Sequence, residues 1–313
     1  MLSNPDPVAN GPPEIPFDMG PDPRRGSSLP AVAALCSSYF PGSHSQHTVD
    51  RFLMGYEHDG LLRYPPFRVV SAYVDQTHDR DLSRFRSRQF GFDLYPDITT
   101  ALTLGTGELA VDHVLLVCEN GDYATNAKGQ ILYPGYGFFR EMVEVFRASG
   151  RSASVFFDKH LSYDWSKAVW MYEQLAELDI PMLAGSSLPV TWRLPDLELP
   201  LGCALEEAVV CYPADVEAYG IHALEMLQAM VERRRGGESG IAAVQCLQGD
   251  VVWKVAAEGG WSRSLLEAGL QRALSRDLVE TQPTWTPEEL EVAYQERGQV
   301  DTSDLECDFD PPT

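Results

Sequence analysis

The chain lacks the features that mark several large classes of protein. No apolar run approaches the roughly 18 residues of a membrane span, so the sequence predicts no membrane-spanning helix. Positive charge is scarce, because 24 Lys and Arg stand against 46 Asp and Glu, for a formal net charge of −22. A field of that sign repels nucleic acid and anionic membranes, so we expect neither as a partner.

Cysteine is sparse and shows no ligand spacing. The six cysteines include no CxxC pair, which argues against a zinc site or a disulfide framework. Cys36, Cys118 and Cys246 lie in apolar runs, where we expect small buried side chains in a reducing compartment, here the cytoplasm. The N-terminus has no secretory pattern, and the apolar run behind Arg24-Arg25 is too short for a twin-arginine signal.

Both ends of the chain are poor in apolar periodicity. Residues 1–29 are rich in Pro, Gly, Asn and Asp, and we expect a disordered or wrapping arm. Residues 278–313 carry ten acids against one arginine, which is typical of a solvated acidic tail. The remaining sequence divides at a change of pattern into residues 30–193 and residues 194–277.

In the first part, short apolar runs alternate with amphipathic stretches. The alternation predicts an α/β fold, a Rossmann-like doubly wound parallel sheet whose strands end at one edge. The second part predicts a small α+β domain with antiparallel strands at 206–211 and 241–248. The strands expected in the first part are 31–36, 67–74, 112–118, 154–157 and 182–184, and the helices expected are 48–57, 81–90, 98–104, 138–148 and one that Ser162 caps.

Residues 151–193 are the most informative stretch, with the pattern strand, turn, helix, strand. Asp158, Lys159 and His160 follow the first of these strands directly. Side chains just past the carboxyl end of a parallel strand face the ligand crevice. A Lys beside a His could polarise a carbonyl or relay a proton there. The alternative is a helix start with solvated charges.

The turn after the first strand differs from a dinucleotide-binding turn. It contains one glycine, a proline and two aromatics where a glycine-rich backbone is needed to approach a pyrophosphate. Ser38, Ser43 and His44 could still bind a phosphate or carboxylate, or His44 could ligate a metal. Asp75, at the end of the second strand, occupies the place of a ribose-binding acid, and Glu119 ends the third strand. Either acid could equally be a helix cap.

Two further patterns lie beyond the first strands. His222 and Glu225 are three residues apart at the start of an expected helix, so they share a face. They could be a general base with its orienting partner, or two metal ligands, and a structural role for His222 is the alternative. The turn at 185–189 is not a GxSxG elbow, and no Asp or His is spaced persuasively as its partner, so a serine hydrolase is not expected.

The order of these pieces resembles the Gfo/Idh/MocA oxidoreductases. Residues 157–161 (FDKHL) resemble the EKP motif of that family, with Lys159 at the position of its catalytic Lys. Residues 219–225 (YGIHALE) resemble its second motif, with His222 at the position of its catalytic His. The resemblance implies a Rossmann domain, NAD or NADP, and a sugar- or polyol-like substrate. The chain departs from the family in its missing glycine fingerprint, in His160 replacing the Pro, and in its short second part.

Three hypotheses follow from these observations. The first is an oxidoreductase-like enzyme acting on a small polar molecule, with Lys159 and His222 as its acid/base pair. The second is a nicotinamide-independent isomerase, lyase or hydrolase, with a divalent metal ion gathered from His44, Glu119, His160 and His222. The third is a non-catalytic binding protein. We also expect a homo-oligomer.

Overall fold

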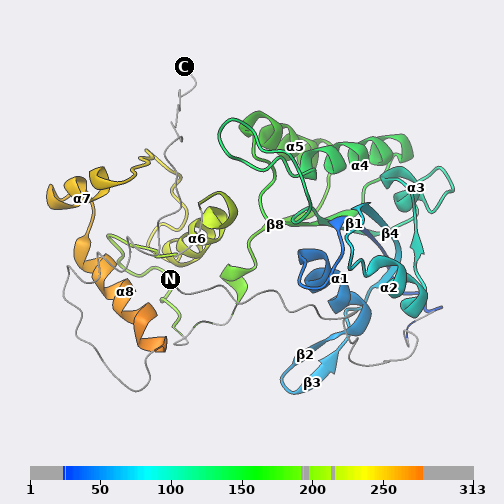
Figure 1. Cartoon of the computed structure of the whole chain (residues 1–313), viewed down its shortest axis with the longest axis horizontal. Helices are drawn as coiled ribbons and strands as arrows, with labels where there is room; N and C mark the ends of the chain where they lie inside the picture. The colour runs from blue at the N-terminus through cyan, green and yellow to red at the C-terminus, as the bar shows by residue number, and fades with distance from the viewer. Residues whose placement is uncertain (1–23, 25, 192, 194–196, 213–215, 278–313) are drawn as a thin grey trace. The chain divides into compact units, whose positions relative to one another are not determined.

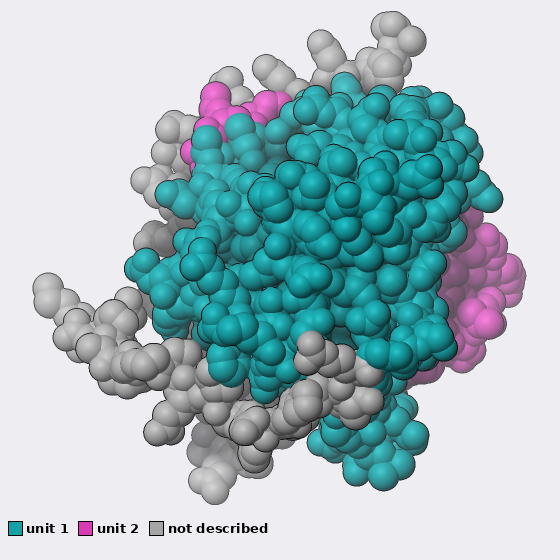
Figure 2. Space-filling model, turned by 90° about the vertical axis from the view of Figure 1, so that its right-hand side faces the viewer, with its two compact units in different colours: residues 1–124, 132–184 teal, residues 125–131, 185–313 magenta. Residues whose placement is uncertain are grey.

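The computed structural model describes residues 24, 26–191, 193, 197–212 and 216–277. The chain divides into two compact units, coloured separately in Figure 2: residues 1–124 with 132–184, and residues 125–131 with 185–313. Most of the expected N-terminal arm, through residue 23, and the expected acidic tail lie outside the described residues. No helix among the described residues is long and apolar enough to cross a membrane.

A six-stranded sheet organises the first unit, with the strand order β5-β4-β1-β6-β7-β8 (Figure 1). Strand β1 pairs in parallel with both β4 and β6, and the pairs β4/β5 and β6/β7 are parallel as well. This order is that of a doubly wound Rossmann sheet, so the α/β fold expected for the first part is confirmed. The strands are β1 (Ala31–Ser38), β4 (Arg68–Gln76), β5 (Asp93–Leu94), β6 (His113–Val117), β7 (Ser154–Asp158) and β8 (Met182–Gly185).

Helices cover both faces of this sheet because the strand side chains alternate between two apolar clusters. On β1, Ala33 and Leu35 join the cluster under α3 (Ile98–Thr103), α4 (Gly135–Ser149) and α5 (Trp165–Glu177). The intervening Val32, Ala34 and Cys36 join the cluster under α1 (His44–Met54) and α2 (Ser83–Phe90). Both faces of β1 are therefore dry, which is why its sequence is continuously apolar instead of alternating.

The helix starts differ from the sequence-based expectations where polar side chains provide unforeseen caps. Helix α1 begins at His44, four residues earlier than expected, because Ser43 is its N-cap and accepts from the Gln46 N–H. Helix α5 is capped by Asp164, which accepts from the Lys167 N–H, so the expectation that Ser162 caps it is wrong. Helix α1 also ends early, at Gly55 with φ of 80°.

A short hairpin follows α1 that the sequence did not predict. Strands β2 (Tyr56–His58) and β3 (Leu61–Arg63) pair in antiparallel register, joined by Asp59 and Gly60, both at positive φ. All six strand residues are exposed, so no buried apolar face marks these strands in the sequence.

The described residues of the second unit form helices, but they form no strand where strands were expected. Its described residues contain η1 (Leu188–Val190), α6 (Val216–Val231), α7 (Asp250–Ala257) and α8 (Arg263–Asp277), and no strand beyond the end of β8. The strands expected at 206–211 and 241–248 are therefore wrong for this unit. Cys246 is exposed, against the expectation that it is buried, whereas Cys36 and Cys118 are buried as expected.

A buried ionic cluster ties α1 to α2. The Arg86 guanidinium donates to both carboxylate oxygens of Asp50, at 3.0 and 2.7 Å, and the Tyr39 hydroxyl donates to the same carboxylate. All three residues are at most 6% exposed. Desolvation, followed by the charge of Asp50, raises the pKa of Tyr39 well above its ordinary value, so its hydroxyl remains a donor at neutral pH.

Removing Asp50 should be severely destabilising, because it leaves a buried guanidinium unpaired. We expect Asp50→Ala to lower the free energy of unfolding by about 3–5 kcal/mol, measured by urea denaturation. The control is Asp79→Ala, at an exposed position, for which a change within about 0.5 kcal/mol is expected. Equal losses in the two variants would contradict the role given to the cluster.

Candidate functional site

The order of the strands reverses between β1 and β6, which makes their carboxyl ends the topological switch point of the sheet. The chain leaves β1 for α1 on one face of the sheet and leaves β6 for α4 on the other (Figure 1). Ligands of open α/β sheets bind at such a switch point. Here the Ser37 hydroxyl of β1 contacts the segment that follows β6, by donating to the carbonyl oxygens of Glu119 and Asn120 at 2.8 and 2.7 Å.

Lys159 and Glu119 form a buried ion pair at this edge. The Lys159 Nζ lies 2.9 Å from Glu119 Oε2, and the residues are 5% and 8% exposed. Lys159 also has a φ of 75°, in the left-handed region that costs a non-glycine residue on the order of 1 kcal/mol or more. The surrounding structure therefore holds this Lys in a strained conformation, at the carboxyl end of β7.

A second ionic contact joins α1 to the end of β7. The His44 Nδ1 lies 2.6 Å from Asp158 Oδ2, and the His44 backbone N–H donates to Asn120 Oδ1 at 2.8 Å. Three of the predicted site residues, Lys159, Glu119 and His44, thus lie at the switch point of one unit.

His160 is the least satisfied polar group of the site. Its Nδ1 is buried and has no hydrogen-bond partner. Desolvation, only partly opposed by the charge of Glu119, lowers the pKa of His160 from its ordinary value of 6.5. The imidazole is therefore neutral at pH 7, and its Nδ1 can accept a proton or a hydrogen bond.

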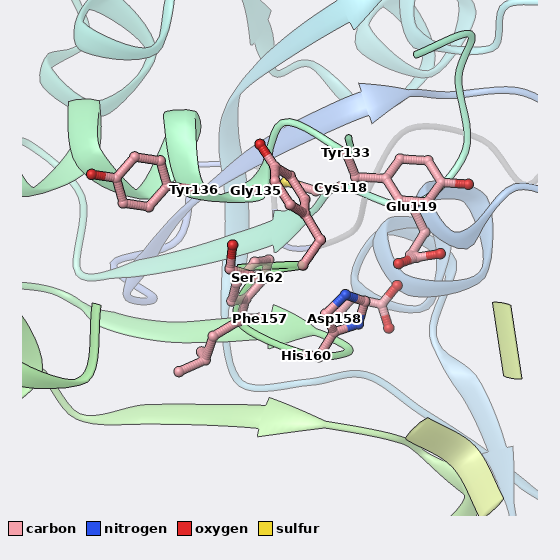
Figure 3. Close-up of a pocket in the computed structure, with 11 residues that line it drawn as sticks. Cys118, Glu119, Tyr133, Gly135, Tyr136, Phe157, Asp158, His160 and Ser162 are labelled. Carbon is pink, nitrogen blue, oxygen red and sulfur yellow. The ribbon is translucent and has the colours of Figure 1, made fainter. Parts of the chain in front are cut away.

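His160 borders a small polar cavity between the ends of β6 and β7. The cavity measures about 20 Å³, which is room for about one water molecule. In Figure 3 the carboxylates of Glu119 and Asp158 converge on the space beside the His160 ring. The remaining lining is aromatic and hydroxyl-bearing: Tyr133, Tyr136, Phe157, Ser162 and Tyr163, with Cys118, Gly135 and Leu161.

The N-terminus of α1 does not fit a dinucleotide pyrophosphate. That group needs backbone N–H donors that point outward from the first turn, but here the chain uses them itself. The Gly42 N–H donates to Gln46 Oε1, the Gln46 N–H to Ser43 Oγ, and the His44 N–H to Asn120. Ser43, expected to bind a cofactor, is instead the helix cap.

The other cofactor positions expected from the sequence are likewise engaged or enclosed. Asp75 accepts from the hydroxyls of Tyr73 and Tyr123, at 2.7 and 2.8 Å, so both of its oxygens have partners. Desolvation, and then the hydrogen bond to Asp75, raises the pKa of both tyrosines. Ser38 is 2% exposed, and its hydroxyl is buried without a partner. A ribose that binds Asp75 would share its carboxylate with these two tyrosine hydroxyls.

The described residues do not form the metal site considered from the sequence. Among them, no group of three or more His, Cys, Asp or Glu side chains could hold a metal ion. His44, Glu119 and His160 belong to the first unit and His222 to the second.

In the second unit, His222 and Glu225 converge on Ser186, in the turn for which the sequence indicated no histidine or acidic partner. The His222 Nδ1 lies 2.5 Å from Ser186 Oγ, and Glu225 Oε2 accepts from the Ser186 N–H at 3.0 Å. No local pattern predicts this contact, because 36 residues separate Ser186 from His222. Lys159 and His222 lie in different units, so their pairing as acid and base stays a prediction.

The first unit is thus a Rossmann-like domain with a self-paired polar site. No protein-family model matches the chain, and no curated protein matches it. Solved structures that are similar to it include a scyllo-inositol dehydrogenase from Lactobacillus casei, at 10% identity and a TM-score of 0.34, which covers 53% of this chain and 38% of its own.

Two further solved structures are also similar to the chain. A Gfo/Idh/MocA family oxidoreductase from Vibrio cholerae is 15% identical, with a TM-score of 0.33, and covers 52% of this chain and 40% of its own. GenD2 from gentamicin A biosynthesis, solved in complex with NAD, is 13% identical, with a TM-score of 0.32, and covers 50% and 34%. The chain spans well under half the length of the solved structures described here.

The buried imidazole makes stability depend on pH. Because the pKa of His160 is lower in the folded chain than its ordinary 6.5, the unfolded chain binds more protons as the pH falls through 6.5. The stability that comes from the neutral His160 is therefore fully present above pH 6.5. Below pH 6.5 the free energy of unfolding falls by up to about 1.4 kcal/mol per pH unit.

We therefore expect His160→Gln to flatten the pH dependence of the free energy of unfolding just below pH 6.5, measured by urea denaturation at several pH values. His58→Gln, at an exposed hairpin position, is the control and should leave the slope unchanged. An unaltered slope in His160→Gln would show that this imidazole is not the titrating group.

Proposed function

We propose that the chain is an enzyme on an oxidoreductase-like scaffold that transfers protons on a small polar, sugar- or polyol-like substrate. The observation that carries the proposal is the neutral His160, whose unpartnered Nδ1 is buried beside the Lys159–Glu119 pair. A neutral imidazole base and a fixed cation are two groups that assist proton abstraction next to a carbonyl.

Each group has a distinct part in this proposal. His160 Nδ1 accepts the proton from the substrate, because the imidazole is neutral at pH 7. Lys159, held by Glu119, stabilises the negative charge that develops on the substrate oxygen, and the strained backbone fixes its position. The Asp158–His44 contact holds the Asp158 carboxylate against α1. A substrate larger than the 20 Å³ cavity requires the lining tyrosines to move.

The cavity favours a neutral polyhydroxylated ligand over an anionic one. Its carboxylates accept hydrogen bonds from hydroxyl groups but repel phosphates. The aromatic rings of Tyr133, Tyr136 and Tyr163 provide flat apolar surfaces on which the C–H face of a sugar ring packs. Isomerisation or elimination suits these groups without a nicotinamide, for which α1 offers no built site.

The experiment is an NMR screen of neutral sugars and polyols in D2O with the purified chain. Proton abstraction from carbon exchanges the C–H signal for deuterium. We expect His160→Gln to slow the exchange by about 10²–10⁴-fold, while the exposed His58→Gln leaves it unchanged. The variant Lys159→Ala alone would leave Glu119 buried and unpaired and could unfold the chain. The role of the Lys159 charge is therefore tested in the double variant Lys159→Met/Glu119→Gln, which removes both charges. Exchange at the wild-type rate in His160→Gln would contradict the proposal.

A nicotinamide-dependent oxidoreductase is the second candidate, favoured by the strand order itself, which is that of dinucleotide-binding sheets. A ligand at 100 times its dissociation constant adds about 2.7 kcal/mol to stability, which thermal unfolding detects readily. Because the α1 donors are engaged, we expect no shift with millimolar NAD or NADP. A shift of several degrees would restore the oxidoreductase and overturn the assignment of α1 as closed.

The predictions of a small-molecule partner, a homo-oligomer and a cytoplasmic location remain proposals. So does the acid/base pairing of Lys159 with His222, because the residues that carry the proton-transfer proposal all lie in the first unit.

A further inference from the structure

A second polar centre lies in the other unit, at the turn that follows β8. Gly185 has a φ of 128°, and a Cβ placed on it would lie 2.5 Å from a carboxylate oxygen of Glu225. Only glycine therefore lets the Glu225 carboxylate approach the backbone closely. The same carboxylate accepts from the Ser186 N–H at 3.0 Å, so the turn is fixed at Ser186.

The hydroxyl of Ser186 contacts a histidine that can act as its base. Ser186 Oγ lies 2.5 Å from His222 Nδ1, and the Leu188 N–H donates to the same oxygen at 3.0 Å. The Ser186 proton is then free to point at the imidazole. His222 and Glu225 are one turn apart on α6, so one helix supplies both the base and the group that holds the serine.

We propose that Ser186 and His222 form a nucleophilic dyad that hydrolyses carboxylic esters. A serine within hydrogen-bond distance of a histidine is the signature of an activated hydroxyl, and both residues are partly exposed, so an ester can reach the oxygen. Glu225 contacts the serine backbone and not the imidazole in this structure, which makes it a positioning residue.

The reaction requires only the ester and water. Ser186 Oγ bonds to the ester carbonyl carbon while its proton moves to His222 Nδ1. The bond from that carbon to the leaving oxygen then breaks, and the imidazolium returns its proton to the departing alcohol. Water attacks the acyl-serine in the same way, its proton passing through His222 back to Ser186 Oγ as the carboxylic acid leaves.

This proposal is independent of the proton-transfer site, because its residues all belong to the second unit. The test uses the full chain, a fluorophosphonate probe and p-nitrophenyl acetate. We expect labelling at Ser186, located by peptide mass spectrometry, and ester hydrolysis that Ser186→Ala abolishes. His222→Asn should slow both by about 10²–10⁴-fold.

The matched control is the neighbouring serine, Ser187→Ala, which should keep full labelling. For Glu225, Glu225→Ala should lower kcat with little change in KM, and the conservative Glu225→Gln should restore most of it, because an amide oxygen can still accept from the Ser186 N–H. No labelling of the wild-type chain, or labelling at Ser186 that persists undiminished in His222→Asn, overturns the dyad.

Discussion

The ion pair between Lys159 and Glu119 is the interaction on which the carboxyl edge of the sheet depends. It joins the residues that follow β6 and β7, and both partners are almost fully buried. Two charges removed from water are tolerated only when each has its partner. The pair therefore fixes the spacing of the two strand ends, and with it the place of Asp158 and His160 on either side of the Lys.

The other contacts of the edge follow from this spacing. The positions of Glu119 and Asn120 bring their carbonyl oxygens to Ser37 and the Asn120 side chain to the start of α1. Asp158, turned toward α1, reaches His44. Asp75, Glu119, Asp158 and Asn120 each have a partner from the chain, whereas the buried Ser38 hydroxyl and His160 Nδ1 have none among the described residues. A ligand gains most where a group is still unsatisfied, because it need not break an existing hydrogen bond.

The sequence predicted the first unit well because burial on both faces leaves a strong local signal. A continuously apolar run such as residues 31–36 can only be a buried strand in this context. The predictions were wrong where side-chain contacts determine where an element begins or whether it forms. Helix α1 starts at His44 because Ser43 and Gln46 cap it, and the exposed β2–β3 hairpin has no apolar face to reveal it.

The site was predictable in part for the same reason. Parallel strands end at one edge, so the positions of Lys159, Glu119 and Asp75 followed from the strand pattern alone. Their partners did not, since Tyr73 and Tyr123 reach Asp75 from different elements. The contact of Ser186 with His222 depends on how the turn after β8 meets α6, and no periodicity records such a meeting of distant segments.

The negative charge at the carboxyl edge disfavours a dinucleotide, the usual ligand of a Rossmann sheet. Asp75, Glu119 and Asp158 lie there together with Asp122, and Lys159 is paired with Glu119. Interactions between charges are stronger where water is scarce, as it is at Glu119 and Asp158, whose side chains are 11% and 17% exposed. A pyrophosphate would therefore meet carboxylates at close range and find the α1 amides engaged. A neutral polyhydroxylated molecule would meet the same carboxylates as hydrogen-bond acceptors. One arrangement thus both disfavours a dinucleotide and provides the acceptors that a sugar requires.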